Sequence, residues 1–71
     1  MTRTYFVERK ADDLKTGNMF VSWAKMLRGE YPIARRITGL MLKKGVITVF
    51  LDDCNSYKFD PDHVVIVEEF A

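Results

Sequence analysis

Gly45–Phe70 reads GVITVFLDDCNSYKFDPDHVVIVEEF, and this stretch decides the fold class. It holds three runs rich in β-branched and aromatic residues, at 46–51, 56–59 and 64–67, and turn-forming Asp, Asn and Pro stand between them. Strand-like runs separated by turn residues, twice in succession, are typical of an antiparallel meander. The stretch therefore predicts a small β-rich domain and leaves its ligand open.

Length and composition limit the size of the core. The chain has 71 residues, and we predict a single domain over residues 1–71 because no repeat, low-complexity tract or Pro/Gly/Ser linker divides it. A domain this short buries roughly 60% of the surface that its unfolded chain exposes, so the core is thin and a large active-site cavity is not expected. The 48% of hydrophobic residues is too high for a disordered chain.

The cysteine count and the first residues indicate a cytoplasmic protein. A single cysteine, Cys54, excludes a disulfide within the chain. Met1-Thr2-Arg3 leads directly into strand-like Tyr5-Phe6-Val7 without an apolar signal region. No apolar run approaches the roughly 20 residues that span a bilayer, so we expect no membrane anchor.

Charge is unevenly distributed along the chain. Residues 1–50 contain ten Lys or Arg and four acidic residues, whereas residues 51–71 contain Lys58 and six acidic residues. Such asymmetry can steer a charged partner to one face of a protein. Alternatively, the charges mix once the chain folds, and the sequence leaves both possibilities open.

The first part of the chain reads as a short strand followed by a turn. Thr4 to Glu8 has strand composition, and residues 11–18 combine aspartates with a Gly-Asn pair that accepts positive φ. Leu14 is the large apolar residue of this turn, so we expect it to close the bottom of the core.

Residues 19–43 can be read as strands. Residues 19–23 show the alternating pattern of a strand. A loop then covers Lys25 to Pro32, and a long strand follows from Ile33 to Leu42. Gly39 would break or bulge this long strand. This reading predicts an all-β fold.

The same residues can also be read as a pair of helices. A first helix would place on one face Phe20, Trp23, Ala24 and Leu27. Asn18 could cap it, and a second helix could run from Pro32 to Lys44 and end at Gly45. Periodicity alone slightly favours this alternative, which predicts an α+β domain of the order βααβββ with a helical pair at 19–43.

The order of short motifs along the chain favours the strands. The motifs are A-x-D-L-x-x-G-N at 11–18, Arg35-Arg36-Ile37-Thr38, Gly45-Val46-Ile47-Thr48-Val49, Tyr57-Lys58-Phe59-Asp60-Pro61-Asp62 and Val64 to Val67. In this order the chain resembles, over residues 11–67, small SH3-like β-barrel proteins of bacteriophages, notably phages of actinobacteria, most of them of unassigned function. In those proteins an A-x-D-L-x-x-G-D opening precedes a strand, and an F-x-P-D turn joins strands four and five. This chain differs at Asn18 and in its apolar Leu40-Met41-Leu42.

The resemblance implies an all-β, five-stranded SH3-like barrel with a 3-10 turn before the last strand, which we expect at Asp60-Pro61-Asp62. A closed barrel of short strands leaves little unpaired edge. The expected strands lie near residues 4–9, 18–24, 33–42, 45–52 and 56–60, with a final piece at 64–69. The expected core residues are Phe6, Leu14, Val21, Ile37, Val49, Phe59 and Val65.

No residue pattern in the sequence indicates catalysis. The lone histidine, His63, follows the Asp-Pro-Asp turn and Cys54 lies at a hairpin tip, so we interpret them as a surface residue and a bystander thiol. One Cys and one His cannot complete a zinc site. The aspartates near residues 52–60 lack the glycine and the terminal glutamate of a calcium loop. We predict a protein that is not an enzyme and uses no cofactor or metal.

Binding is the class of function that remains. A protein-interaction site is predicted at Met26, Leu27, Arg28 and Tyr31, since Met, Tyr and Arg are enriched at interface centres. If the chain is phage-encoded, as the resemblance implies, it would be an accessory protein in the host cytoplasm. Its partner would be a host factor or another copy of itself, and the protein would be a monomer or a small homo-oligomer.

Nucleic-acid binding is the alternative. Small barrels that bind single-stranded nucleic acid combine cations, which neutralise phosphates, with aromatic rings, which stack on bases. The candidate residues are Lys25, Arg28, Arg35, Arg36, Lys43, Lys44 and Trp23. The pI of about 7.9 is below that of dedicated nucleic-acid binders, and we expect Trp23 to fill the core. Protein interaction therefore ranks first.

Overall fold

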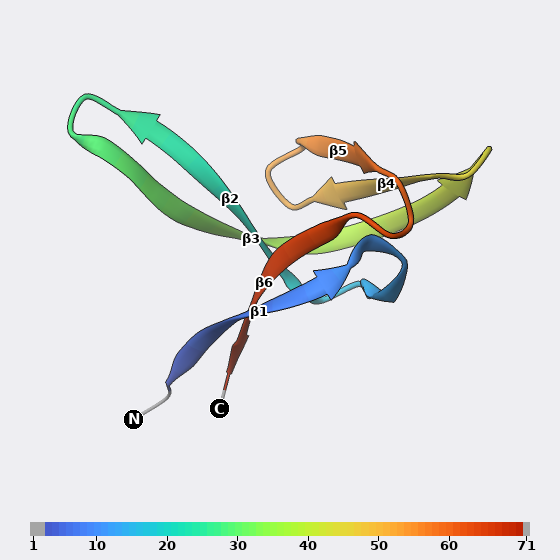
Figure 1. Cartoon of the computed structure of the whole chain (residues 1–71), viewed down its shortest axis with the longest axis horizontal. Helices are drawn as coiled ribbons and strands as arrows, with labels where there is room; N and C mark the ends of the chain where they lie inside the picture. Colours follow the sequence, from blue (N-terminus) through green and yellow to red (C-terminus); the bar gives the residue numbers. More distant parts are fainter. Residues whose placement is uncertain (1–2, 71) are drawn as a thin grey trace.

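The computed structural model describes residues 3–70, with Met26 described by its backbone. Within this range the chain forms six strands and a short 3-10 helix (Figure 1). The elements are β1 (Thr4–Lys10), η1 (Ala11–Asp13), β2 (Met19–Met26), β3 (Gly29–Lys43), β4 (Val46–Leu51), β5 (Ser56–Phe59) and β6 (Val64–Phe70). The all-β prediction is confirmed, and the helical pair at 19–43 is wrong because β2 and β3 occupy that segment.

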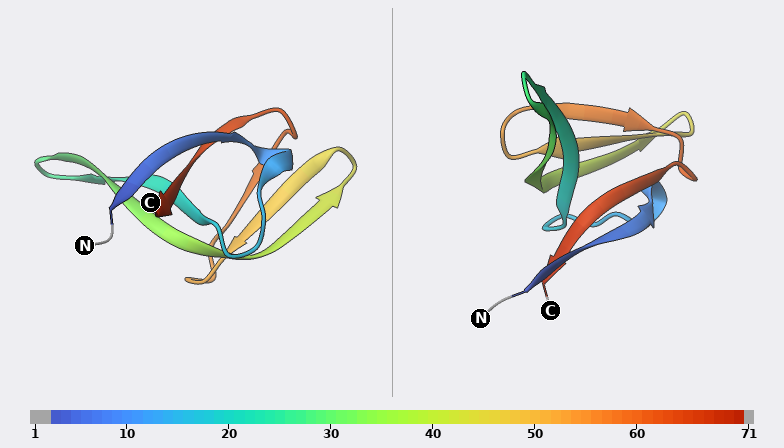
Figure 2. Two further views of the ribbon diagram at one scale, coloured as in Figure 1. Left: turned by 90° about the horizontal axis from the view of Figure 1, so that it is seen from below. Right: turned by 60° about the vertical axis from the view of Figure 1, so that its left-hand side comes forward.

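The strands form an antiparallel sheet in the order β1-β6-β2-β3-β4-β5. The long strand β3 belongs to both halves of this sheet, since its first part pairs with β2 and its second part pairs with β4. The register with β4 shifts between Ile37 and Gly39, which confirms the bulge expected at Gly39. Because a bulge bends its strand, the two halves of the sheet fold toward each other (Figure 2).

The pairing leaves the sheet open. Within residues 3–70, β1 and β5 are the outer strands of the order, and no pairing joins them to close a barrel. The 3-10 turn expected before the last strand is instead a β-turn, closed by the His63 N–H that donates to the Asp60 carbonyl at 3.0 Å. The 3-10 helix of the described chain is η1, which donates to this same turn through the N–H groups of Ala11 and Asp12.

The hydrophobic core lies between the two halves of the sheet. Its buried members are Ala11, Leu14, Phe20, Ile37, Ile47, Val49, Leu51, Val65 and Val67. Burial is confirmed for the expected Leu14, Val21, Ile37, Val49 and Val65, and Phe59 is partly buried against the core.

Phe6 was expected in the core, and this prediction is wrong because its side chain is 47% exposed. Its neighbour Val7 pairs with the buried Val67 and packs against the core instead. Successive residues of a strand point to opposite faces, so β1 can bury one of the two. The run Tyr5-Phe6-Val7 is apolar throughout, and its composition therefore does not reveal which face is the inner one.

Two tight turns use residues with positive φ. Lys44 (φ 52°) and Gly45 (φ 73°) form the two-residue β3–β4 loop in the type I′ conformation that suits a hairpin. Between β4 and β5, the Cys54 N–H closes a turn by donating to the Leu51 carbonyl at 3.2 Å. Cys54 itself has a positive φ of 70°. Among residues 3–70 no helix is long and apolar enough to cross a membrane.

Candidate functional site: the projecting β2–β3 hairpin

The outer part of β2 and β3 leaves the body of the domain as a two-stranded ribbon. The pairing of β2 with β6 ends at Val21, and the pairing of β3 with β4 begins at Ile37. Within the described chain, residues 22–35 of this hairpin therefore pair across the hairpin alone, and Figure 1 shows it extending away from the other strands. The radius of gyration is 12.5 Å, against about 11 Å expected for a compact chain of this length.

The expected loop at Lys25 to Pro32 is wrong. β2 continues to Met26 and β3 begins at Gly29, so the turn consists of Leu27 and Arg28. Extended backbone on either side agrees with Pro32, because the residue before a proline is restricted to the β region. The segment that sequence reasoning treated as a loop is a hairpin with a short tip.

Pro32 modifies the free edge of this hairpin. The Asp52 N–H donates to the Arg36 carbonyl at 3.0 Å, so Arg36 directs its backbone groups away from β2. Pro32 lies four residues earlier on the same strand and faces the same outer edge, where it offers no N–H. A proline at an edge hinders the addition of another strand. A partner would therefore engage the side chains of the hairpin rather than extend its sheet.

The side chains of the hairpin are apolar and exposed. Trp23 is 54% exposed and Tyr31 is 45% exposed, and Leu27 at the tip is fully exposed. Trp23 was expected to fill the core, and this prediction is wrong because β2 has left the sheet by that position, where Trp23 lies opposite Pro32. Ile33 adds a fourth exposed large apolar side chain. Trp23 lies opposite Pro32, so these two residues share one face of the ribbon. Tyr31 and Ile33 flank Pro32 in the strand and therefore lie on the other face. Exposed large apolar side chains are common at interaction sites.

The tip of the hairpin forms an open hollow, lined by Lys25, Leu27, Arg28 and Tyr31. Three of the four residues predicted for protein binding, Leu27, Arg28 and Tyr31, therefore meet at one place. The fourth, Met26, lies between them on β2, and its side chain lies outside the described part of the structure. Sequence reasoning named Trp23 for the nucleic-acid alternative and did not name Ile33, and neither residue lines this hollow. Their exposure depends on where β2 leaves the sheet.

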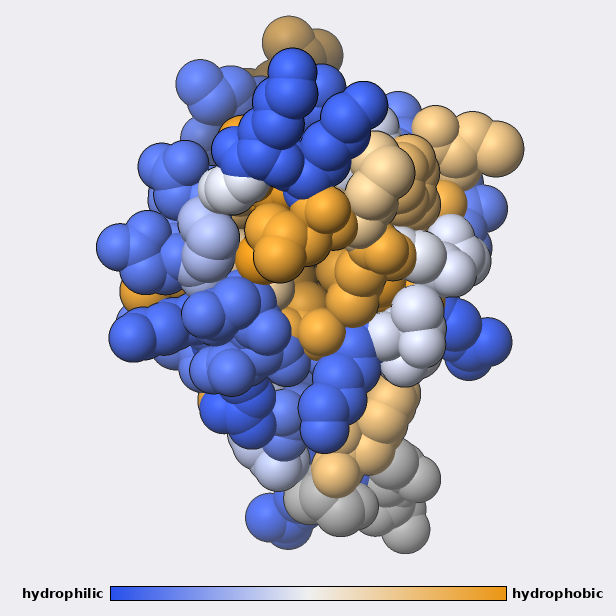
Figure 3. Space-filling model, turned by 90° about the vertical axis from the view of Figure 1, so that its right-hand side faces the viewer, coloured by the Kyte–Doolittle hydropathy of each residue, from blue (hydrophilic) through white to orange (hydrophobic). Residues whose placement is uncertain are grey.

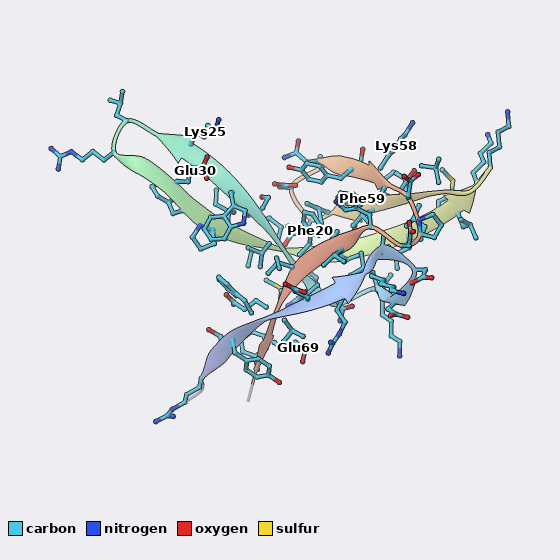
Figure 4. The ribbon with its side chains drawn as sticks, viewed as in Figure 1. Phe20, Lys25, Glu30, Lys58, Phe59 and Glu69 are labelled. Carbon is cyan, nitrogen blue, oxygen red and sulfur yellow. The ribbon has the colours of Figure 1, made fainter. Side chains whose placement is uncertain are left out.

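The β2–β3 hairpin is net basic, because residues 22–36 contain Lys25, Arg28, Arg35 and Arg36 and one acidic residue, Glu30. Lys25 lies opposite Glu30 in the β2–β3 register, and Figure 4 shows the two residues on facing strands of the hairpin. At the base of the hairpin, the Arg35 Nε lies 3.6 Å from Asp53 Oδ2. Arg28 is thus the cation of the tip that has no acidic residue opposite it in this register.

The residues of the nucleic-acid alternative are distributed over separate parts of the molecule. Five of the seven lie on the β2–β3 hairpin, namely Trp23, Lys25, Arg28, Arg35 and Arg36, whereas Lys43 and Lys44 lie at the tip of the β3–β4 hairpin. The two tips point to opposite sides of the molecule (Figure 1). The fold therefore keeps four of the six predicted cations on the β2–β3 hairpin and separates Lys43 and Lys44 from them.

Lys43 and Lys44 gain a neighbour that sequence reasoning missed. Lys58 lines the same surface hollow, together with Thr48, because β4 and β5 place Lys58 opposite Thr48. Lys58 stands in the acidic last third of the sequence, so the strand register was the signal needed to assign it here.

Ion pairs join the basic and acidic parts of the sequence. Arg9 Nη2 lies 2.7 Å from Glu69 Oε1, and Arg35 contacts Asp53 as described above. These contacts support the possibility that the charges mix on folding. The pKa of Asp53 is lowered because the backbone N–H and the side-chain amide of Asn55 both donate to its carboxylate, with a further contribution from Arg35.

His63 and Cys54, the side chains considered for catalysis, lie at different turns. His63 is exposed and stacks on Phe59, with ring centroids 5.1 Å apart, and Cys54 is an exposed free thiol at the β4–β5 turn. Across residues 3–70 no three His, Cys, Asp or Glu side chains gather in a way that could hold a metal ion.

In comparisons with known proteins, the chain matches no protein-family model, no curated protein and no solved structure.

Proposed function

We propose that this protein is a non-catalytic binding module that engages a protein partner through the β2–β3 hairpin. The main support is the exposure of Trp23, Leu27 and Tyr31 on a ribbon that leaves the sheet. A two-stranded hairpin alone is marginally stable in water, because half of its apolar surface stays uncovered. Trp, Tyr and Arg are also the residue types that dominate binding energy at interfaces. Docking a partner would bury this surface and stabilise the hairpin.

We further propose that the protein is a phage-encoded accessory protein that acts in the host cytoplasm. This proposal rests on the sequence resemblance to small SH3-like proteins of bacteriophages. The bent sheet, with β3 shared between its halves and a bulge at Gly39, is compatible with an SH3-like barrel that is open between β1 and β5. The partner would be a host factor or another copy of the chain.

Nucleic-acid binding is the second candidate function, because Lys25 and Arg28 lie near Trp23 and Tyr31 on the hairpin. Against it, Glu30 lies opposite Lys25, and Lys43 and Lys44 lie at another tip. A protein partner could cover the fully exposed Leu27, whereas a polyanion would leave it exposed and would be opposed by Glu30.

Affinity capture from nuclease-treated host lysate tests the proposal. The wild-type protein should retain one stoichiometric protein, and the doubly substituted Leu27→Ser, Tyr31→Ser variant should lose it. Leu42→Ser is the matched control, since Leu42 is also an exposed leucine but lies on the β3–β4 hairpin. Retention of the captured protein by the double variant would contradict docking at the hairpin.

Titration with single-stranded and duplex oligonucleotides distinguishes the second candidate. If phosphates are the ligand, affinity should fall steeply between about 50 and 200 mM salt, because each neutralised phosphate releases counterions. Salt-sensitive binding that is lost on Lys25→Ala, Arg28→Ala substitution would favour nucleic acid over the proposed protein partner. The same loss on Lys43→Ala, Lys44→Ala would assign the binding to the other hairpin.

A further inference from the structure

A basic hollow of about 340 Å³ lies on the outer face of β3, β4 and β5. Thr48 lines it, and the core residues Ile47 and Val49 stand on either side of Thr48 in β4. Because successive residues of a strand point to opposite faces, the hollow lies on the face that is turned away from the core. Figure 4 shows Lys58 of this hollow pointing away from Phe59, which packs against the core.

The hollow carries a concentrated positive charge. Of the described residues that line it, three are lysines and none is acidic: Met41, Lys43, Lys44, Val46, Thr48 and Lys58. Neither ion pair formed within residues 3–70 involves one of these lysines. Asp60 follows Lys58 by two residues, but it lies beyond the end of β5 and does not line the hollow. Figure 3 shows hydrophilic residues gathered along one border of an apolar area at this end of the molecule. An anion in the hollow would relieve the repulsion among the lysines.

The same face continues beyond the hollow to the ring of Phe50, which is 39% exposed. Phe50 follows Thr48 by two residues in β4, and its neighbours in the register are Gly39 and Ser56. Gly39 has no side chain and Ser56 has a short one, so neither neighbour covers the ring. A Cβ atom at Gly39 would lie 3.6 Å from Phe50 Cδ2, which places the ring directly beside the glycine. The face therefore presents an aromatic ring to solvent next to a group of cations.

The lysines and the ring stand in three successive rows across the sheet. In order along β4, Lys43 lies opposite Val46, Lys58 lies opposite Thr48, and Phe50 forms the third row. The rows are about 7 Å apart, because a strand advances about 3.4 Å per residue. Aromatic rings that stack on bases, beside cations that neutralise phosphates, are the features that bind single-stranded nucleic acid.

We propose that this outer face binds single-stranded nucleic acid, with one base stacked on Phe50 and the adjoining phosphates at the three lysines. The charge of the hollow selects a polyanion. The exposed ring selects a single strand, because the bases of a duplex stack on each other and are not open to Phe50. The hollow shares no lining residue with the one at the tip of the β2–β3 hairpin. A protein partner at that hairpin and a nucleic acid on the outer face would therefore occupy separate surfaces.

Fluorescence anisotropy of a labelled single-stranded oligonucleotide of about ten nucleotides measures this binding. At about 50 mM salt the wild-type protein should bind with a Kd between about 1 and 100 µM. Three neutralised phosphates give log K a slope of about −2 against log salt, so the affinity should fall about 20-fold at about 200 mM salt. Lys43→Ala with Lys58→Ala should reduce this slope to about −0.7, because one phosphate contact remains. Lys25→Ala with Arg28→Ala removes the same charge from the β2–β3 hairpin and should leave the slope unchanged.

Stacking on Phe50 gives a second test that does not depend on charge. Phe50→Leu keeps an apolar side chain and should weaken single-strand binding at least about fivefold without changing the salt slope. Phe50→Tyr keeps a ring and should retain the wild-type affinity. Phe6→Leu is the matched control, since Phe6 is also a half-exposed phenylalanine but lies on β1. Circular dichroism checks that each variant is folded.

Four results would overturn the proposal. The first is a wild-type protein that binds no oligonucleotide at about 1 mM protein and about 50 mM salt. The second is a salt slope that responds to the Lys25→Ala, Arg28→Ala variant instead, which would place the nucleic acid at the β2–β3 hairpin. The third is an equal effect of Phe50→Leu and Phe6→Leu. The fourth is binding to anionic phosphatidylserine vesicles in place of the oligonucleotide, which would assign the lysines to a lipid surface.

Discussion

The rings of Phe20 and Tyr57 stack with their centroids 5.3 Å apart and their planes inclined by 29°. Phe20 belongs to β2 and Tyr57 to β5, so this contact joins the two halves of the bent sheet across the core. Phe59 extends the cluster, with its ring 5.8 Å from that of Phe20, and Figure 4 shows both phenylalanines near the centre of the molecule. Aromatic pairs add roughly 0.5–1.5 kcal/mol beyond the area that they bury.

Removing the Phe20 ring should therefore be costly. We expect Phe20→Ala to lower the free energy of unfolding by about 3–5 kcal/mol, because a buried ring is replaced by a cavity. Phe6→Ala is the matched control and should cost less than about 1 kcal/mol, since Phe6 is half exposed and lies outside the core cluster. Urea denaturation measures both values. Equal losses for the two variants would show that the core face of the sheet has been assigned incorrectly.

Replacing Cys54 by glycine should stabilise the protein. Cys54 occupies the left-handed position of the β4–β5 turn, where glycine avoids the clash of a Cβ atom. We expect Cys54→Gly to raise the free energy of unfolding by about 0.5–1 kcal/mol. Cys54→Ala separates the backbone effect from loss of the thiol, because alanine keeps the Cβ. If alanine stabilises as much as glycine, the gain comes from removing the thiol.

The Asp53 carboxylate should make stability depend on pH. Its folded-state pKa is lowered by the two hydrogen bonds from Asn55, so folding favours the ionised form. The stabilisation is present above the unfolded pKa of about 3.9 and is lost as the pH falls through the lowered folded pKa. Asp53→Ala should therefore destabilise the protein at neutral pH and have little effect at about pH 2. Asp52→Ala, which changes the net charge equally, is the control, and an Asp53→Ala effect that persists at the lowest pH would contradict this origin.

Most of the strands could be predicted because turn residues separate them. The run from Asp52 to Asn55 and the Asp60-Pro61-Asp62 turn set the limits of the last three strands, and Gly39 marks the bulge. The pairing that leaves β1 and β5 as edges could not be predicted, since it depends on which strands meet in space. The sequence also did not show which face of β1 is buried, because Phe6 and Val7 are both apolar.

Three of the residues predicted for protein binding share one hairpin tip, where the sequence predicts a loop. Leu27, Arg28 and Tyr31 stood out by residue type, and they meet at one hairpin tip. Trp23 and Leu27 are apolar and stand four positions apart, as on one face of an amphipathic helix. In the structure both residues are exposed. A hydrophobic pattern predicts burial, and these two exposed residues depart from that rule.

Trp23 is the sole tryptophan of the chain, so its fluorescence reports on the hairpin directly. The free protein should show the red-shifted emission of a solvated indole that acrylamide quenches readily, because Trp23 is more than half exposed. Addition of the captured protein partner should shift the emission to the blue and protect it from quenching, and the Leu27→Ser, Tyr31→Ser variant should show neither change. A blue-shifted, protected indole in the free protein, or an unchanged spectrum in a complex that does form, would contradict docking at the β2–β3 hairpin.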